Sequence, residues 1–89
     1  MTRDEAEMVG LKALQFLARD EERFTRFLAL SGTSPQDIAA IAGERHFLAG
    51  VVEHLLTDES LLFLFVSDED LEPDAPAQAQ RALADPMAE

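Results

Sequence analysis

The side chains in this sequence that could bind a metal ion are His46, Glu53, His54 and Asp58. Metal ligands on one helix usually lie three or four residues apart, because that spacing places them on the same face. His46 and His54 are eight residues apart, which is about 12 Å along a helix axis. His54 and Asp58 have a better spacing, but we expect the helix to end between them. The sequence therefore predicts no metal site, only two half-exposed histidines.

Residue patterns typical of enzymes are missing as well. The chain has no cysteine, so a thiol nucleophile and a thiolate zinc site are excluded. Nothing marks a pair of carboxylates set in an apolar pocket, and Ser31, Ser34, Ser60 and Ser67 suit helix caps or turns. The acidic segment SDEDLEPDAP, residues 67–76, lacks the glycine and the closing glutamate of a calcium loop. We expect no catalytic residue, no cofactor and no enzyme activity.

Residues 35–56, PQDIAAIAGERHFLAGVVEHLL, are similar to a DNA-binding helix-turn-helix. That motif favours a small residue, a turn glycine and a buried aliphatic residue, and Ala39, Gly43 and Val52 fall near those positions. The recognition face would then offer Arg45, His46, Ala49 and Glu53. Phosphate contacts depend on Lys and Arg, and only one of these four side chains is firmly positive. The sequence favours a helix pair used for packing, with nucleic-acid binding as the alternative.

Charge is distributed unevenly along the 89 residues, whose net charge is −11. Residues 1–43 carry seven acids and five bases, a net charge of −2, whereas residues 44–89 carry eleven acids and two bases, a net charge of −9. The acidic half should repel phosphate backbones and anionic lipids, and could attract a basic protein surface. The longest apolar run has six residues, far fewer than a membrane span needs. We expect a cytoplasmic protein that does not bind membranes.

Helix signals recur along the chain. Thr2 and Glu5 form a capping box, so a first helix should start near Arg3. Asp20 can cap a second helix, which Gly32 would end. Further helices are predicted over residues 35–42, from about residue 44 to residue 57, and over residues 59–69. In the fourth helix of the chain, residues 44–57, Gly50 could mark a close crossing with another helix.

The composition changes after residue 72, where the chain becomes rich in Ala, Pro and Gln. We predict a helical domain over residues 1–72 and an acidic C-terminal segment over residues 73–89, either a short helix capped by Asp74 or a frayed tail. The fold class is all-α, a small bundle of five short helices with a sixth short helix as an option. The predicted core consists of Val9, Phe16, Leu17, Phe24, Phe27, Leu28, Ile38, Ile41, Leu48, Val51, Leu55, Leu61, Leu62 and Phe65.

Six consecutive apolar residues, LLFLFV at 61–66, lie between two acidic clusters. No second strand-like run exists to pair with this one, and leucine favours helix, so we predict a helix over residues 59–69. A helix that is apolar on every side is normally buried on every side. The alternative is that one flank stays open for a second copy or a partner. The candidate partner-binding residues are then Phe63, Leu64, Asp68, Glu69 and Asp70.

Two phrases carry a family resemblance: FTRFLALSG at 24–32, and FL at 47–48 together with DESLL at 58–62. Over residues 6–85 the chain resembles an uncharacterised family of short, acidic, all-helical bacterial proteins, a domain of unknown function. The resemblance implies a helical fold and a bacterial cytoplasmic setting, and it implies no activity.

These observations predict a small protein-interaction module that uses apolar helix docking and an acidic surface. Its partner would be another protein or a second copy of the chain. Nucleic-acid binding through residues 35–56 is the second hypothesis. The third is that the acidic half imitates a nucleic acid and occupies a basic protein groove.

Overall fold

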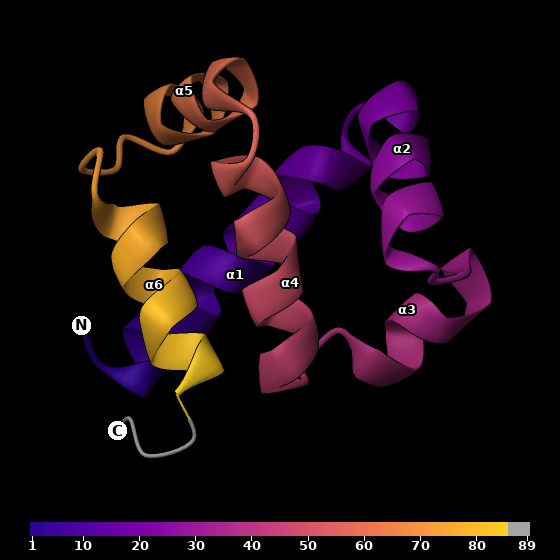
Figure 1. Ribbon diagram of the computed structural model, residues 1–89, viewed down its shortest axis with the longest axis horizontal. Helices are drawn as coiled ribbons and strands as arrows, with labels where there is room; N and C mark the ends of the chain where they lie inside the picture. The colour runs from indigo at the N-terminus through magenta and orange to yellow at the C-terminus, as the bar shows by residue number, and fades with distance from the viewer. Residues whose placement is uncertain (86–89) are drawn as a thin grey trace.

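The computed structural model describes residues 1–85, which form six helices joined by short turns and contain no strand (Figure 1). This confirms the all-α class and the optional sixth helix. The helices are α1 (Arg3–Ala18), α2 (Glu21–Ser31), α3 (Pro35–Ile41), α4 (Arg45–Leu56), α5 (Glu59–Asp68) and α6 (Ala75–Ala84). Residues 86–89, the end of the predicted C-terminal segment, lie outside the described residues.

Side-chain caps explain where three of the helices begin. At α1, Thr2 and Glu5 form the predicted capping box, with hydrogen bonds of 2.9 Å and 3.1 Å between each side chain and the other's backbone N–H. Asp20 and Asp58 precede α2 and α5, and each carboxylate accepts a hydrogen bond of 3.1 Å from the N–H three residues later. These bonds satisfy donors that a helix leaves unpaired at its N-terminus.

The end of α5 is a Schellman motif whose left-handed residue is Asp70 rather than glycine. The N–H of Leu71 donates to the carbonyl of Val66 at 2.9 Å, and that of Asp70 donates to the carbonyl of Ser67 at 3.4 Å. Asp70 has a φ of 53°, which aspartate tolerates better than most residues but not as well as glycine. The turn therefore ends α5 one residue before the predicted boundary.

The core is built by three helices, α1, α4 and α6, which all pack against one another. In Figure 1, α4 and α6 lie side by side and α1 passes behind both. Among the predicted core residues, Val9, Phe16, Leu17, Phe27, Leu48, Val51, Leu55 and Phe65 are buried, whereas Phe24, Leu28, Ile38, Leu61 and Leu62 are partly buried against the core. Ile41 is half-buried and lies outside this cluster.

A glycine does mark a close helix crossing, but it is Gly10 and not Gly50. A Cβ added at Gly10 would lie 2.9 Å from the Cβ of Leu48, so α1 and α4 approach each other there too closely for any side chain. A Cβ added at Gly50 would meet nothing within 4 Å. The prediction for Gly50 was wrong because its face of α4 is open rather than covered.

Aromatic contacts attach the outer helices to the core. From α2, the Phe27 ring lies 6.0 Å from that of Phe47 and 5.2 Å from the His54 imidazole, both on α4. From α5, the Phe65 ring lies 5.4 Å from that of Phe16 on α1. α2 and α5 therefore each insert one fully or nearly fully buried phenylalanine, and the rest of their surface is less constrained.

The C-terminal segment contributes to the same core. α6 starts two residues after the change of composition at residue 73, and its side chains Ala79 and Leu83 are fully buried. The division at residue 72 stays a prediction from composition, whereas the packing of α6 is a separate finding.

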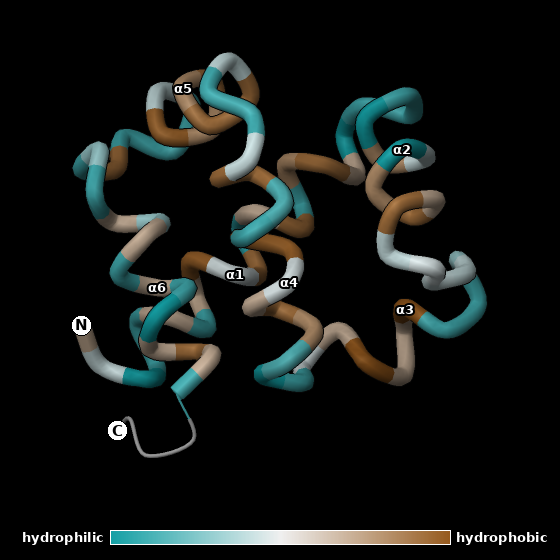
Figure 2. Tube along the Cα trace, viewed as in Figure 1, coloured by the Kyte–Doolittle hydropathy of each residue, from teal (hydrophilic) through white to brown (hydrophobic). Residues whose placement is uncertain are grey.

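The molecule is flat, with Cα extents of 30 × 27 × 17 Å. Figure 2 shows that much of the α5 trace is apolar although this helix lies at the edge of the molecule. Between residues 3 and 84, no helix combines the length and the hydropathy needed to cross a bilayer.

Candidate partner-binding site

The apolar run of α5 is covered on one side and open on another. Phe65 is fully buried, and Leu61 and Leu62 are half-buried against the core. Phe63 and Leu64 are 66% and 41% exposed. Since a helix needs a buried face only where it contacts the core, this small domain leaves the second flank of α5 uncovered.

The three acidic residues at the end of α5 have different surroundings. Asp68 is exposed, and Asp70 occupies the left-handed position after the helix. The Glu69 carboxylate lies 3.6 Å from Arg19 and 4.0 Å from Lys12, both on α1, and its side chain is only 16% exposed. Glu69 therefore connects α5 to α1, and of the three only Asp68 and Asp70 lie beside the open flank as free surface charges.

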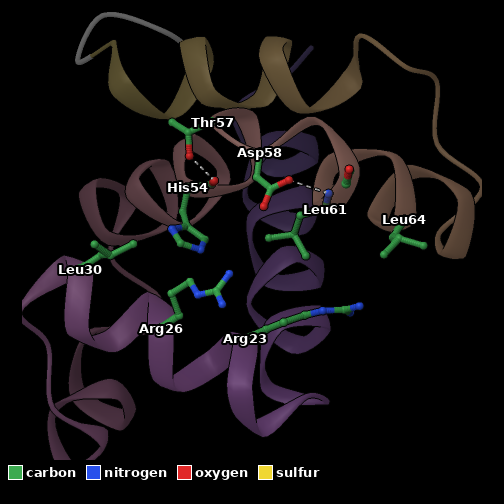
Figure 3. A pocket seen from close by; sticks show the side chains of 9 residues that line it. Arg23, Arg26, Leu30, His54, Thr57, Asp58, Leu61 and Leu64 are labelled. Atoms are coloured by element: carbon green, nitrogen blue, oxygen red, sulfur yellow. Dashed lines mark hydrogen bonds between the residues drawn. The ribbon is translucent and has the colours of Figure 1, made fainter.

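A cleft that the sequence analysis did not predict lies between α2 and α5, at the C-terminal end of α4 (Figure 3). We call it the α2–α5 cleft; its volume is 380 Å³. Its lining includes three basic side chains, three leucines and three other polar residues. These are Arg23, Arg26 and His54; Leu30, Leu61 and Leu64; and Thr57, Asp58 and Ser60.

The two arginines of the cleft are held differently. The Arg23 guanidinium lies 5.2 Å from the centre of the Phe16 ring, and 3.9 Å separates its Nε from the Asp20 carboxylate. Arg26 is exposed and makes no ion pair within residues 1–85. Figure 3 shows Arg26 extending from α2 toward His54 and Asp58. One cation is thus fixed in place, while the other remains available.

His54 forms the inner wall of the cleft. Burial is the main cause that lowers the pKa of His54 below its ordinary 6.5; Asp58 opposes this change and Arg26 adds to it. The backbone around it is fixed, because the Thr57 hydroxyl donates a hydrogen bond of 2.7 Å to the His54 carbonyl. An anion that entered the cleft would favour the charged imidazole.

A second hollow of 310 Å³ continues from the cleft along α2 and α4. It shares Leu30, His54 and Thr57 with the cleft, and Gly50 forms part of its floor. Gly50 has no side chain, and nothing stands within 4 Å of where a Cβ would be, so this part of the second hollow is open. The shared residues make the two hollows neighbours along α2 and α4.

The residues predicted for nucleic-acid recognition do not form one open face. Helices α3 and α4 exist at about the expected positions, but Ala49 is buried in the core. The Arg45 guanidinium lies 3.5 Å from the backbone carbonyl of Asp85, while His46 and Glu53 are exposed. Basic side chains are too few on this face to neutralise several phosphates.

The side chains that could bind a metal ion are also dispersed over the molecule. Within residues 1–85, no three His, Asp or Glu side chains gather closely enough to hold an ion.

A sequence signal for the cleft exists in retrospect. Arg23, Arg26 and Leu30 have the spacing i, i+3 and i+7, which places them on one face of a helix. This face lies beside Phe24, Phe27 and Leu28, the predicted core residues of α2. That α5 stands opposite depends on tertiary packing, which no local spacing shows.

The chain was compared with family models, curated proteins and solved structures. A family model described as a protein of unknown function (DUF3572) matches residues 3–86. No curated protein matches the chain, and no solved structure does.

Proposed function

The chain belongs to the DUF3572 family of proteins of unknown function, and we propose that it works as a small protein-interaction module. The docking surface consists of Leu30 on α2 and Leu64 on α5, which line the α2–α5 cleft, and of Phe63, which lines a neighbouring hollow together with Leu64. The observation that supports this proposal most strongly is the exposure of these three large apolar side chains, at 73%, 66% and 41%. Large apolar side chains gathered around a concavity are typical of binding sites.

The position of these side chains supports a docking role over a role in folding. Leu30 and Leu64 both line the cleft, at opposite ends of it in Figure 3, and Phe63 and Leu64 line a further shallow hollow on α5. Neither helix needs them for attachment, since Phe27 and Phe65 already anchor α2 and α5. A partner that covered this surface would remove apolar area from water and gain affinity in proportion.

The acidic residues next to the surface would guide the partner rather than anchor it. Asp68 and Asp70 are exposed at the end of α5. Exposed charges of this kind mainly raise the rate of encounter with an oppositely charged surface.

Affinity capture with quantitative mass spectrometry tests the proposal. The tagged protein and the double variant Phe63→Ser, Leu64→Ser are compared in extracts of the cells that encode the chain. We expect the variant to lose proteins that the unmodified chain retains, because polar side chains there remove the apolar contacts.

The double variant Met8→Ser, Leu11→Ser is the matched control. These two side chains on α1 are 56% and 38% exposed, close to the values for Phe63 and Leu64, and they lie outside the cleft. Equal capture by all three proteins would contradict a docking role for the α5 surface.

A further inference from the structure

The α2–α5 cleft has a charge opposite to that of the molecule. The chain carries seven Lys and Arg residues and a net charge of −11. Two of those seven residues, Arg23 and Arg26, line this one cleft together with His54. Elsewhere, Lys12 and Arg19 are paired with Glu69. Arg23 is paired with Asp20, so Arg26 is the cation of the cleft that has no ion pair within residues 1–85, on a molecule whose net charge is negative.

We propose that the α2–α5 cleft binds an acidic apolar segment of a partner protein. In this segment Asp or Glu carboxylates would pair with Arg26 and with Arg23, while neighbouring large apolar side chains would contact Leu30, Leu61 and Leu64. The inference rests on the proposed function and adds the chemistry of the partner. It differs from the sequence-based expectation of a basic partner, because two arginines line the cleft although the molecule as a whole is acidic.

The geometry of the arginines suits a carboxylate. Arg23 is stacked on Phe16, so its side chain loses little freedom when a second anion arrives. Arg26 makes no ion pair within residues 1–85, and binding would break no existing bond there. The one acid in the lining, Asp58, already accepts the Leu61 N–H as the cap of α5. Arginine–carboxylate pairs that exclude water are among the stronger polar contacts at interfaces.

The shape of the two hollows favours a segment of chain over a compact small molecule. The cleft of 380 Å³ and the hollow of 310 Å³ are neighbours that share Leu30, His54 and Thr57, and both follow α2. Gly50 keeps the second hollow open at a position where no packing contact requires glycine. A peptide helix or extended segment lying along α2 could place a carboxylate at the arginines and an apolar side chain over Gly50.

Peptide selection from a random phage-displayed dodecapeptide library tests this inference and does not require an identified partner. The immobilised full chain is the target, and the selected peptides are synthesised for fluorescence titration. We expect the enriched sequences to combine Asp or Glu with Leu, Ile or Phe. They should bind the Arg26→Glu variant about tenfold more weakly or worse, the effect of losing a charged hydrogen bond and adding repulsion.

Two further variants locate the binding. Arg3→Glu, the same charge change at an exposed position on α1, should bind the peptides as the unmodified chain does. Gly50→Leu adds a side chain to the floor of the second hollow where there is free space, so it should fold normally and bind more weakly. In NMR spectra, the peptides should raise the pKa of His54, a readout that a purely structural role of Arg26 would not produce.

Selected peptides without acidic residues, peptides that bind Arg26→Glu as tightly as the unmodified chain, or no enrichment at all would each overturn the inference. The proposed function fails separately, when the Phe63→Ser, Leu64→Ser variant captures the same cellular proteins as the unmodified chain. If the selected peptides are basic and bind the double variant more weakly, the result would support the docking surface but refute the proposal of an acidic segment.

Discussion

At the scale of single residues, local backbone geometry and side-chain charge each give a measurable consequence. Asp70 occupies a left-handed position that glycine would adopt without steric cost. Burial at the contact of α2 with α4 lowers the pKa of His54.

Replacing Asp70 by glycine should stabilise the protein. The left-handed conformation costs a residue with a side chain roughly 1 kcal/mol, and glycine also removes a negative charge from the C-terminal end of α5. Asp70→Ala removes the same charge without the conformational gain. In urea denaturation, Asp70→Gly should have a free energy of unfolding about 1 kcal/mol above that of Asp70→Ala; equal values would show that the turn is not strained.

Stability should fall as the pH is lowered through the titration of His54. Its pKa is below 6.5 in the folded protein and near 6.5 in the unfolded chain, so between these values the unfolded chain binds more protons. The free energy of unfolding therefore decreases from pH 7 downward and levels off once the pH is below the folded pKa. Denaturation from pH 7 to pH 5.5 measures this.

The variant His54→Gln should show a smaller decrease over the same range. His46→Gln, which removes the exposed histidine from the other end of α4, is the matched control. A decrease that is the same in the unmodified protein and in His54→Gln would contradict the assignment.

At the scale of helices, the crossing of α1 and α4 at Gly10 limits how the core can change. α1 and α4 approach there closely enough that an added Cβ would lie 2.9 Å from the Leu48 Cβ. A Cβ is fixed to the backbone and cannot rotate away, so only a shift of one helix would relieve the clash.

Alanine substitution at the two glycines should have opposite effects. Gly10→Ala should lower the free energy of unfolding by roughly 1–3 kcal/mol from overpacking, partly offset by the higher helix propensity of alanine. Gly50→Ala should raise it by up to about 1 kcal/mol, since nothing opposes the gain in propensity. Chemical denaturation of both variants provides the measurement, and a change of the same sign in both would contradict the crossing geometry.

The helices themselves were predictable because their signals are local. The capping pairs at Thr2, Asp20 and Asp58 and the left-handed cap at Gly32 are visible in the sequence and occur in the structure. The role of Gly10 and the α2–α5 cleft were not predictable, because they depend on which helices meet. A glycine in a helical pattern looks the same whether another helix touches it or not.

At the scale of the whole molecule, the first and last helices belong to one core. α6 packs against α1 and α4, and Figure 1 shows the N-terminus near the C-terminal end of α6. The small core therefore depends on a segment whose composition, rich in Ala, Pro and Gln, favours a surface role. Leu83 is the largest side chain that α6 buries completely.

Replacing Leu83 by alanine should destabilise the protein by about 2–5 kcal/mol, the usual cost of a cavity at a fully buried leucine. Leu30→Ala, at an exposed leucine, should change the free energy of unfolding by less than about 0.5 kcal/mol.

A chain that ends at residue 72 should lose its cooperative thermal transition. Retention of that transition by the shortened chain would show that residues 1–72 fold independently.

The contact of α1 with α6 has a consequence for synthesis in the cell. Ala6 and Val9 on α1 are synthesised before α6, a helix that packs against α1 and ends at residue 84. Until that helix has left the exit tunnel, the nascent chain displays the apolar faces of α1 and α4 to chaperones and to other chains. The protein should therefore acquire protease resistance only after residue 84 has been translated and released.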